Sequence, residues 1–328
     1  MLIELSLIFF ISSLAMVFFQ VPFWMSFFLK KGKTGIDIHK ENRPVIPEMC
    51  GVAILISLTV LGVILYIIVP NLAYITVISV ALIGGIIGLI DDLVDLGGKV
   101  KPLLTLLASI PIFILGQYQP HPALPFIPST RLTIIYPILI PLGIAISTNA
   151  VNMLNVVNGS TPLLLMPIFL SLMIISFIQG SFSPIPVIAL ALGALLAFYF
   201  YNKYPARAFM GNNGDFFLGA YLGAIAITFH LEVATLVAMF PYIMHGFYAL
   251  SSVGRLFEHK EIRNKPVVFR SGLLYSSSDP QAPMTLLRLI VLKQPLSEKQ
   301  VGYVFFFMSC LSSTLAVITS LLTNVRLL

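Results

Sequence analysis

Two adjacent carboxylates mark the first place in this sequence where chemistry could occur. Asp91 and Asp92 end the strongly apolar run 81–90, and Asp95 follows three residues later. Neighbouring carboxylates beside an apolar run repel each other, and a bound cation is the simplest compensation. A structural role stays open, because acidic residues at a membrane border are solvated and can cap a following helix. The functional interpretation is our leading hypothesis.

A second polar cluster is rich in asparagine. Asn149, Asn152, Asn155 and Asn158 recur at a spacing of three, which on a helix would form one polar stripe. Their amides offer carbonyl oxygens to a hard cation and N–H donors to a phosphate or a base. Such stripes also join membrane helices to each other, so the structural interpretation is equally open.

A third cluster is a glycine-flanked polar turn, 211–215, that opens another apolar run. Lys203 and Arg207 precede it, so the turn could be an anion-binding helix start, although a single loop of this kind is weak evidence.

Two other segments carry charge. The segment 39–44 is typical of a solvated juxtamembrane linker. The last polar stretch carries His259, Lys260 and Arg263, which could meet anionic headgroups or a pyrophosphate.

The elements that carry these clusters are membrane helices by composition. Hydrophobic residues make up 58% of the 328 residues and charged residues only 10%, whereas charged residues are about a quarter of an ordinary soluble domain. This excludes a soluble globule and a disordered chain. We predict an all-α polytopic membrane protein of about ten spanning helices in a single domain, 1–328. The predicted spans are 3–29, 51–69, 73–90, 102–116, 133–150, 163–179, 184–201, 214–230, 233–250 and 302–322.

The basic residues define the orientation of these spans. If the chain crosses at each span, all of the 19 Lys and Arg residues except Arg131 and Arg326 fall on one side. The positive-inside rule makes that side cytoplasmic, with both termini outside and 251–301 as a long cytoplasmic loop. The polar clusters lie on the same side. The formal net charge of +6 therefore belongs to a membrane face, and we predict no nucleic-acid partner.

In order and spacing, the clusters resemble the polyprenyl-phosphate N-acetylhexosamine-1-phosphate transferases of glycosyltransferase family 4. The resemblance runs in order from about 35 to 270. The residues around Asn158 and Tyr204 resemble those of the eukaryotic dolichyl-phosphate branch and its archaeal relatives. The bacterial muramoyl-pentapeptide branch has a histidine cluster in the last inner loop, where this sequence has only His259. The matching segments are Ile46-Pro47-Glu48, Asp91-Asp92 with Lys101, 148–152 with Asn158-Gly159, and 202–211.

The resemblance implies a reaction and its partners. An N-acetylhexosamine 1-phosphate, GlcNAc-1-phosphate above all, would pass from a UDP-N-acetylhexosamine to a polyprenyl or dolichyl phosphate, releasing UMP. Mg²⁺ would be the cofactor, with Mn²⁺ as the alternative ion. The enzyme would lie among membrane lipid in a prokaryotic, archaeal-type plasma membrane with its site on the cytoplasmic face, or in the ER membrane of a eukaryote. A homodimer stays open.

The resemblance also assigns residues. Because a phosphate monoester near pH 7 is already largely ionised, with a second pKa of about 6, we expect the paired carboxylates to position charge rather than to abstract a proton. The implied catalytic positions are Asp91, Asp92 and Lys101. The implied substrate positions are Glu48, Asn149, Asn158, Arg207 and Phe209, with a looser match for His259, Lys260 and Arg263. The implied metal positions are Asn152 and Asn212.

Asn212 departs from the family pattern, because the family has Gly-Asp where this sequence has Gly211-Asn212. The missing negative charge should weaken Mg²⁺ binding. Asp215 lies one helical turn later and could take over as a metal ligand. This departure leaves open a family member that binds without catalysis. A transporter or flippase of a phosphorylated lipid is the other alternative, but it should show charged groups near the bilayer midplane and a paired repeat, which we do not find.

Overall fold

The computed structural model describes residues 1–122, 124, 131–254 and 264–323, and the chain is mostly helical. Helix occupies every predicted span, although 102–116 and 233–250 are broken into shorter pieces. The helices are α1 (Leu2–Lys30), α2 (Val52–Ile68), α3 (Leu72–Val94), α4 (Val100–Leu106), the 3₁₀ turn η1 (Leu107–Ser109), α5 (Ile110–Ile114), α6 (Tyr136–Met153), α7 (Ser160–Ile178), α8 (Ile185–Asn202), α9 (Gly211–Thr228), α10 (Glu232–Ala238), α11 (Phe240–Val253), α12 (Leu286–Ile290) and α13 (Glu298–Thr323).

The length and composition of the helices identify an integral membrane protein. Within the described residues, six helices are long and apolar enough to cross a membrane, namely α1, α3, α6, α7, α8 and α13. The pair α10 and α11, bent by 64° at the break, would make a seventh. The helix α2 and the broken helix Val100–Ile114 are shorter. About ten crossings and the outside position of both termini therefore stay predictions.

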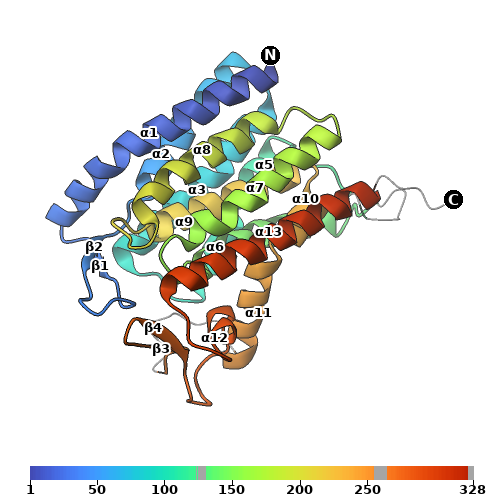
Figure 1. Ribbon diagram of the computed structural model, residues 1–328. Coiled ribbons are helices and arrows are strands. Elements are labelled where there is room, and N and C mark those ends of the chain that lie inside the picture. Colours follow the sequence, from blue (N-terminus) through green and yellow to red (C-terminus); the bar gives the residue numbers. More distant parts are fainter. Residues whose placement is uncertain (123, 125–130, 255–263, 324–328) are drawn as a thin grey trace.

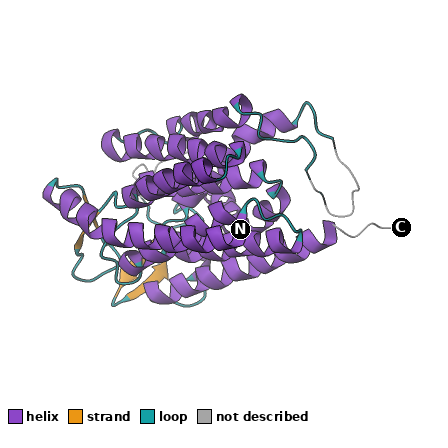
Figure 2. Ribbon diagram, turned by 90° about the horizontal axis from the view of Figure 1, so that it is seen from above, coloured by secondary structure: helices purple, strands orange, loops and turns teal. Residues whose placement is uncertain are grey.

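Two short hairpins correct the expectation of an all-α chain. The strands β1 (Thr34–Ile36) and β2 (Val45–Pro47) pair antiparallel, with Gly35 opposite Ile46. The strands β3 (Val267–Arg270) and β4 (Leu273–Ser276) form the second hairpin. Strands of three or four residues are too short to show a clear alternation in sequence. Both hairpins lie at one end of the helix bundle, opposite the start of α1 and the end of α13 (Figure 1; Figure 2 gives the view from above).

The helix α9 lies at the centre of the bundle, and its residues from Asn213 to Thr228 are buried. Glycines bring its neighbours close. A Cβ atom at Gly84 of α3 would lie 2.7 Å from the Cβ of Ala220, and one at Gly219 of α9 would lie 2.6 Å from the carbonyl oxygen of Ser147 in α6. Small residues at such contacts are typical of membrane helix packing. As a result, the polar start of α9 lies directly against the end of α3.

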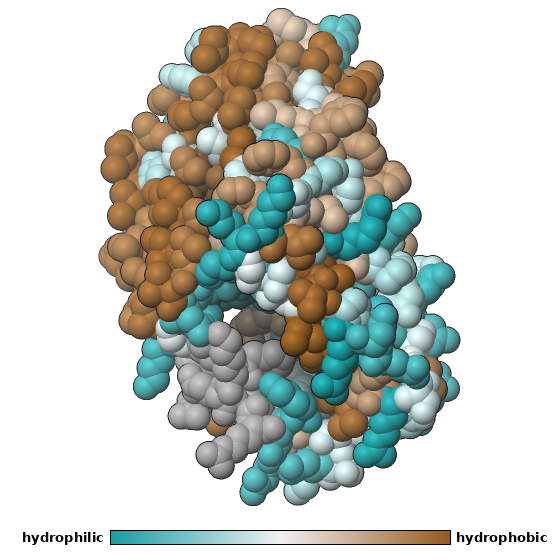
Figure 3. Space-filling view, turned by 90° about the vertical axis from the view of Figure 1, so that its left-hand side faces the viewer, coloured by the Kyte–Doolittle hydropathy of each residue, from teal (hydrophilic) through white to brown (hydrophobic). Residues whose placement is uncertain are grey.

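The surface is divided by polarity. Hydrophobic residues cover the upper part of the face seen in Figure 3, and hydrophilic residues gather around a hollow lower down. On α1 the aromatic side chains of Phe19 and Phe23 are 76% and 63% exposed. An apolar surface of this kind fits hydrocarbon rather than water as its solvent, so the polar end with the hairpins is the part that can meet water-soluble ligands.

Candidate active site

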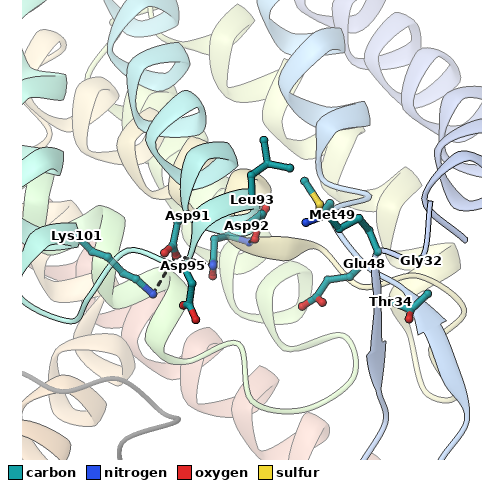
Figure 4. A pocket seen from close by; sticks show the side chains of 11 residues that line it. Gly32, Thr34, Glu48, Met49, Asp91, Asp92, Leu93, Asp95 and Lys101 are labelled. Carbon is teal, nitrogen blue, oxygen red and sulfur yellow. Dashed lines mark hydrogen bonds and ion pairs between the residues drawn. The ribbon is translucent and has the colours of Figure 1, made fainter.

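A cavity of about 350 Å³ opens between the end of α3, the start of α4, the start of α9 and the segment that carries the first hairpin. We call it the acidic pocket. Among the described residues, its charged lining consists of Glu48, Asp91, Asp92 and Asp95 with the two lysines Lys33 and Lys101. In Figure 4, Lys101 and Asp95 lie on one side, Glu48 and Thr34 lie on the other, and Asp92 lies between them. Four carboxylates therefore face two ammonium groups around one open volume.

Both oxygen atoms of the Asp91 carboxylate have partners within the site. Its Oδ2 atom lies 3.0 Å from the Lys101 Nζ and accepts a hydrogen bond of 2.6 Å from the Asn212 amide. Its Oδ1 atom accepts the backbone N–H of Leu96 at 2.8 Å. The structure therefore brings together Asp91, Lys101 and Asn212, which the sequence assigned to one site. One carboxylate joins the end of α3 to α4 and to α9.

Asp92 caps the start of α9. Its Oδ1 accepts the backbone N–H of Asn212 at 2.9 Å, and its Oδ2 accepts the backbone N–H of Asn213 at 3.0 Å and the Asn213 side-chain amide at 2.6 Å. The first N–H groups of a helix lack partners within the helix, and the helix dipole favours an anion there. The predicted anion-binding helix start exists, but the anion that these groups bind is the protein's own carboxylate.

Lys203 and Arg207, predicted to assist that helix start, turn away from it. The Arg207 guanidinium donates to the carbonyl oxygen of Phe200 at 2.9 Å and lies 5.1 Å from the Tyr201 ring. The Lys203 ammonium lies 5.5 Å from the Phe200 ring. Both cations therefore pack on the end of α8. The structure does not bring Arg207 to the acidic pocket.

The prediction that the four asparagines share one helical face is wrong. The helix α6 ends at Met153, and Asn155 and Asn158 lie in the loop beyond it. Asn149 has a structural role, because it links two helices. Its amide donates to the Thr105 hydroxyl at 2.9 Å and to the Ala145 carbonyl oxygen at 2.7 Å. It therefore joins α6 to α4. Asn152 lies half-buried in the last turn of α6, and its metal assignment stays a prediction.

Asp215 lies away from the lining of the acidic pocket, buried near the start of α9. Its Oδ2 accepts the Asn155 amide at 2.7 Å and its Oδ1 accepts the Thr161 hydroxyl at 2.8 Å. These bonds tie α9 to the loop after α6 and to the first turn of α7. Asn212 bonds instead to Asp91, so the two residues that sequence reasoning grouped on one helix face have different partners. A metal role for Asp215 stays a prediction.

A second charged cluster, which sequence reasoning missed, is centred on Lys40. We call it the Lys40 clasp, and it consists of Asp37, His39, Lys40, Asn158, Tyr204 and Glu298. The Lys40 ammonium forms an ion pair with Glu298, lies 3.2 Å from Asp37 Oδ2 and donates to Asn158 Oδ1 at 3.2 Å. It also lies 4.1 Å from the Tyr204 ring. The expectation of a solvated linker is wrong at this residue, since the Lys40 side chain is only 12% exposed.

Asn158 connects the clasp to the loop before α9. Its Oδ1 also accepts the backbone N–H of Ala206 at 2.9 Å, and its own backbone N–H donates to Glu298 Oε1 at 2.7 Å. The His39 Nδ1 atom lies 3.8 Å from the same Glu298 oxygen. The clasp therefore joins four segments that are far apart in sequence. The only sequence signal was a lone acidic residue, Glu298, at the start of the last helix.

Phe209 holds the loop before α9 against the first hairpin. Its N–H donates to the Pro47 carbonyl oxygen at 2.9 Å, and its carbonyl oxygen accepts the Cys50 N–H at 3.0 Å. Its ring packs beside Gly35, where an added Cβ would lie 3.1 Å from a ring carbon and 3.5 Å from a Glu48 carboxylate oxygen. Glu48 therefore lines the acidic pocket and Phe209 lies beside it, and the substrate-binding roles of both residues stay predictions. His259, Lys260 and Arg263 lie outside the described residues.

The donor atoms of the acidic pocket suit a hard cation. In the part of the chain that the structure describes, no group of three or more His, Cys, Asp or Glu side chains is already arranged to hold a metal ion. The pocket nevertheless offers carboxylate oxygens and the Asn212 amide oxygen, which are ligands that Mg²⁺ prefers. The sequence analysis assigned no site role to two charged residues of its lining, Lys33 and Asp95, although it noted Asp95 three residues after Asp92.

Comparison with known proteins places this pocket in a family context. The family described as glycosyl transferase family 4 matches residues 74–230, which include Asp91, Asp92, Lys101 and Asn212. A protein of Methanocaldococcus jannaschii named "Putative glycosyltransferase" is 29% identical over 295 residues, 88% of this chain and 89% of the relative.

Two other relatives have more specific names. A Saccharolobus solfataricus protein named "Putative UDP-N-acetylglucosamine–dolichyl-phosphate N-acetylglucosaminephosphotransferase" is 28% identical over 313 residues, 92% of this chain and 93% of the relative. A phospho-N-acetylmuramoyl-pentapeptide-transferase of Streptococcus pyogenes is 26% identical over 246 residues, 69% of this chain and 73% of the relative. The similarity therefore extends well beyond the segment that contains the pocket.

Proposed function

We propose that the chain is a member of glycosyl transferase family 4, which it matches over residues 74–230, and that it transfers GlcNAc 1-phosphate from UDP-GlcNAc to dolichyl phosphate or another polyprenyl phosphate. The names of the archaeal relatives support this choice of substrates. The observation that carries the proposal is the acidic pocket, where Asp91, Asp92 and Lys101 meet the start of α9 at the polar end of a membrane bundle.

The reaction joins two anions, and the pocket residues suit that requirement. An oxygen of the lipid phosphate forms a bond to the sugar-bearing phosphorus of UDP-GlcNAc. The bond from that phosphorus to the bridging oxygen breaks, and UMP leaves with that oxygen. The acceptor is ionised near pH 7 without a base, since its second pKa is about 6. The contribution of the protein is therefore to position and screen charge, as Lys101 can do from its place beside Asp91.

Mg²⁺ is the cation that we propose for this pocket, held by Asp91, Asp92 and the Asn212 amide oxygen. When bound, it would neutralise negative charge on the diphosphate. Asn212 supplies a neutral ligand in place of a carboxylate, so the affinity for Mg²⁺ should be lower than in relatives with an aspartate at this position. The observation that supports the assignment is the excess of carboxylates over ammonium groups among the described lining residues.

Glu48, Phe209 and Asn158 would contact the nucleoside of the donor. The packing of Phe209 beside Gly35 and Glu48 supports a shared role for Phe209 and Glu48. We also propose that the pocket faces the cytoplasm of a prokaryotic cell. This orientation is supported by the distribution of Lys and Arg over the loops and by the archaeal relatives.

A reconstituted transfer assay tests the proposal. Detergent-purified protein is incubated with a polyprenyl phosphate, UDP-GlcNAc labelled in the sugar, and Mg²⁺, and both UMP and labelled lipid are measured. We expect equal amounts of the two products, loss of both with EDTA, and recovery when Mg²⁺ is restored. If neither product forms with UDP-GlcNAc or with other UDP-hexosamines, the enzyme assignment is wrong.

A further inference from the structure

Lys33 is the second cation of the acidic pocket, and nothing above assigns it a role. We infer that Lys33 binds the phosphate of the lipid acceptor; this inference rests on the proposed function and deepens it. Lys33 lines the cavity and lies between the end of α1 and the start of β1. Figure 4 shows its neighbours in the chain, Gly32 and Thr34, across the cavity from Asp91 and Lys101.

The backbone of Lys33 is fixed on both sides. Its N–H donates to the Phe28 carbonyl oxygen at 3.0 Å, and that of Gly32 donates to the Leu29 carbonyl oxygen at 3.1 Å. Gly32 has a φ of +66°, so α1 ends in the left-handed turn that favours glycine. The carbonyl oxygen of Lys33 in turn accepts the Glu48 N–H at 3.1 Å. The Cα atom from which the Lys33 side chain projects is therefore held at the pocket wall.

The charge of Lys33 is available to a ligand. Lys101, the other pocket lysine, lies 3.0 Å from Asp91 and is neutralised by it. For Lys33, no carboxylate oxygen of the described residues lies within ion-pair distance. A lysine whose backbone is fixed in a cavity, and whose charge has no ion-pair partner among the described residues, is suited to a phosphate, which an ammonium group binds as a point charge.

The position of Lys33 along the membrane normal distinguishes between the two phosphate-bearing substrates. The exposed aromatic side chains of α1, Phe19, Phe23 and Phe27, recur every four residues and suit hydrocarbon down to the last turn of the helix. Lys33 lies three residues after the end of α1 at Lys30, and so at the membrane boundary. The phosphate of a polyprenyl lipid must stay at this boundary because its chain is in the bilayer, whereas a UDP-sugar arrives from water.

The test measures the KM of each substrate separately in neutral-detergent micelles. Lys33→Met and Lys33→Gln remove the charge, and Lys33→Arg retains it. The matched control is Lys31→Met, because Lys31 is exposed at the same end of α1 but does not line the cavity. We expect the first two variants to raise the KM for polyprenyl phosphate about tenfold or more, which is typical of losing a charged hydrogen bond. Lys33→Arg should restore most of the affinity, and the KM for UDP-GlcNAc should stay unchanged in all variants.

Three results would overturn the inference. A raised KM for UDP-GlcNAc instead would assign Lys33 to the donor. An unchanged KM for both substrates would mean that Lys33 binds neither of them. An effect that occurs only after phosphatidylglycerol is added would identify a phospholipid headgroup as the ligand, and each assay is therefore run with and without that lipid. Failure of the proposed function looks different, because the wild-type protein itself would then form neither UMP nor lipid product.

Discussion

The acidic pocket and the Lys40 clasp both gather charged side chains from distant segments around the first hairpin, but they use charge differently. In the clasp, Lys40 and Glu298 neutralise each other, and their side chains are only 12% and 2% exposed. In the acidic pocket, the described residues that line an open cavity of about 350 Å³ include four carboxylates and two lysines. The clasp is closed, and its two carboxylates both lie within ion-pair distance of Lys40, whereas the pocket is open and its described lining carries an excess of negative charge.

This difference indicates which cluster stabilises the fold and which one binds ligands. A buried ion pair whose two charges neutralise each other leaves no charge for a ligand. Removing one partner of such a pair leaves the other charge buried and unpaired. Unbalanced charge around a cavity is typical of a functional site. Substitutions in the clasp should therefore change stability most, and substitutions in the pocket should change activity most.

The largest effect is expected at Glu298. Glu298→Gln leaves the buried Lys40 ammonium with Asp37 as its remaining carboxylate partner and weakens the contact to the Asn158 N–H, so the free energy of unfolding should fall by about 2–3 kcal/mol. Denaturant titration in detergent measures this change. Glu4→Gln is the control, because Glu4 pairs with the N-terminal amine at the surface, where both groups are more than 80% exposed, and it should leave stability unchanged. Similar stability for both variants would refute the structural role of the clasp.

The next effect concerns Asp92 and activity. Asp92→Asn keeps one acceptor oxygen for the start of α9 but removes the negative charge, so stability should fall by only about 1 kcal/mol. The kcat for transfer should fall about 100-fold or more, as is typical when a group that orders transition-state charge is lost. Asp279→Asn serves as the control, since Asp279 also accepts a backbone N–H, from Gln281, but lies outside the pocket. Equal loss of activity in both variants would contradict a site at Asp92.

A smaller change should sharpen the metal assignment. Asn212→Asp replaces the amide that donates to Asp91 at 2.6 Å with a second carboxylate, so the two side chains repel each other unless a cation lies between them. The Mg²⁺ concentration for half-maximal activity should fall on the order of tenfold, and Mg²⁺ should raise the melting temperature more than in wild type. An unaltered Mg²⁺ requirement would remove Asn212 from the proposed metal site.

Asp215→Asn is the companion variant in the same Mg²⁺ titrations. If the only role of Asp215 is to accept hydrogen bonds from Asn155 and Thr161, the free energy of unfolding should fall and the Mg²⁺ concentration for half-maximal activity should stay the same. A raised Mg²⁺ requirement would instead support the metal role predicted from its spacing to Asn212.

The smallest effect is expected at Cys50, which lies between the pocket residue Glu48 and α2. Burial, assisted by the Glu48 carboxylate, raises the pKa of the Cys50 thiol to about 12. A raised pKa means less thiolate at alkaline pH, and the thiolate is the reactive form. In a Cys310→Ser background, N-ethylmaleimide should therefore leave Cys50 unmodified at pH 8 to about 9 until the protein is unfolded, as mass spectrometry would show. Rapid labelling of the folded protein would mean that this wall of the pocket opens to solvent.

The helices could be predicted from sequence because apolar runs are a local property. Each predicted span contains helix, and Asp91 and Asp92 lie at the end of α3 as expected. The hairpins were missed because three or four residues carry no clear periodicity. The helical stripe of asparagines failed at Met153, because spacing alone cannot say where a helix ends.

The site was predictable where a residue belongs to a helix end and not where a loop decides its direction. Asp91, Asp92, Lys101 and Asn212, all at helix ends, do line one cavity. Arg207 lies in a loop, and its guanidinium turns back to Phe200 and Tyr201. The same limit hid Lys40, whose charge appeared to belong to a linker until Glu298 and Asn158 approached it from elsewhere in the chain.

Composition and pattern by themselves determined that this protein is a helical membrane protein whose charged residues gather at one end of its helices. They also determined which residue types could handle phosphate and metal. Only the tertiary structure decided that Asp92 caps α9, that Lys40 is neutralised by Glu298, and that Lys33 faces the cavity with its charge available. The physical reason is that charge and hydrogen bonding act over a few ångströms in space, so the partner of each polar group depends on how close the packed helices and loops bring it.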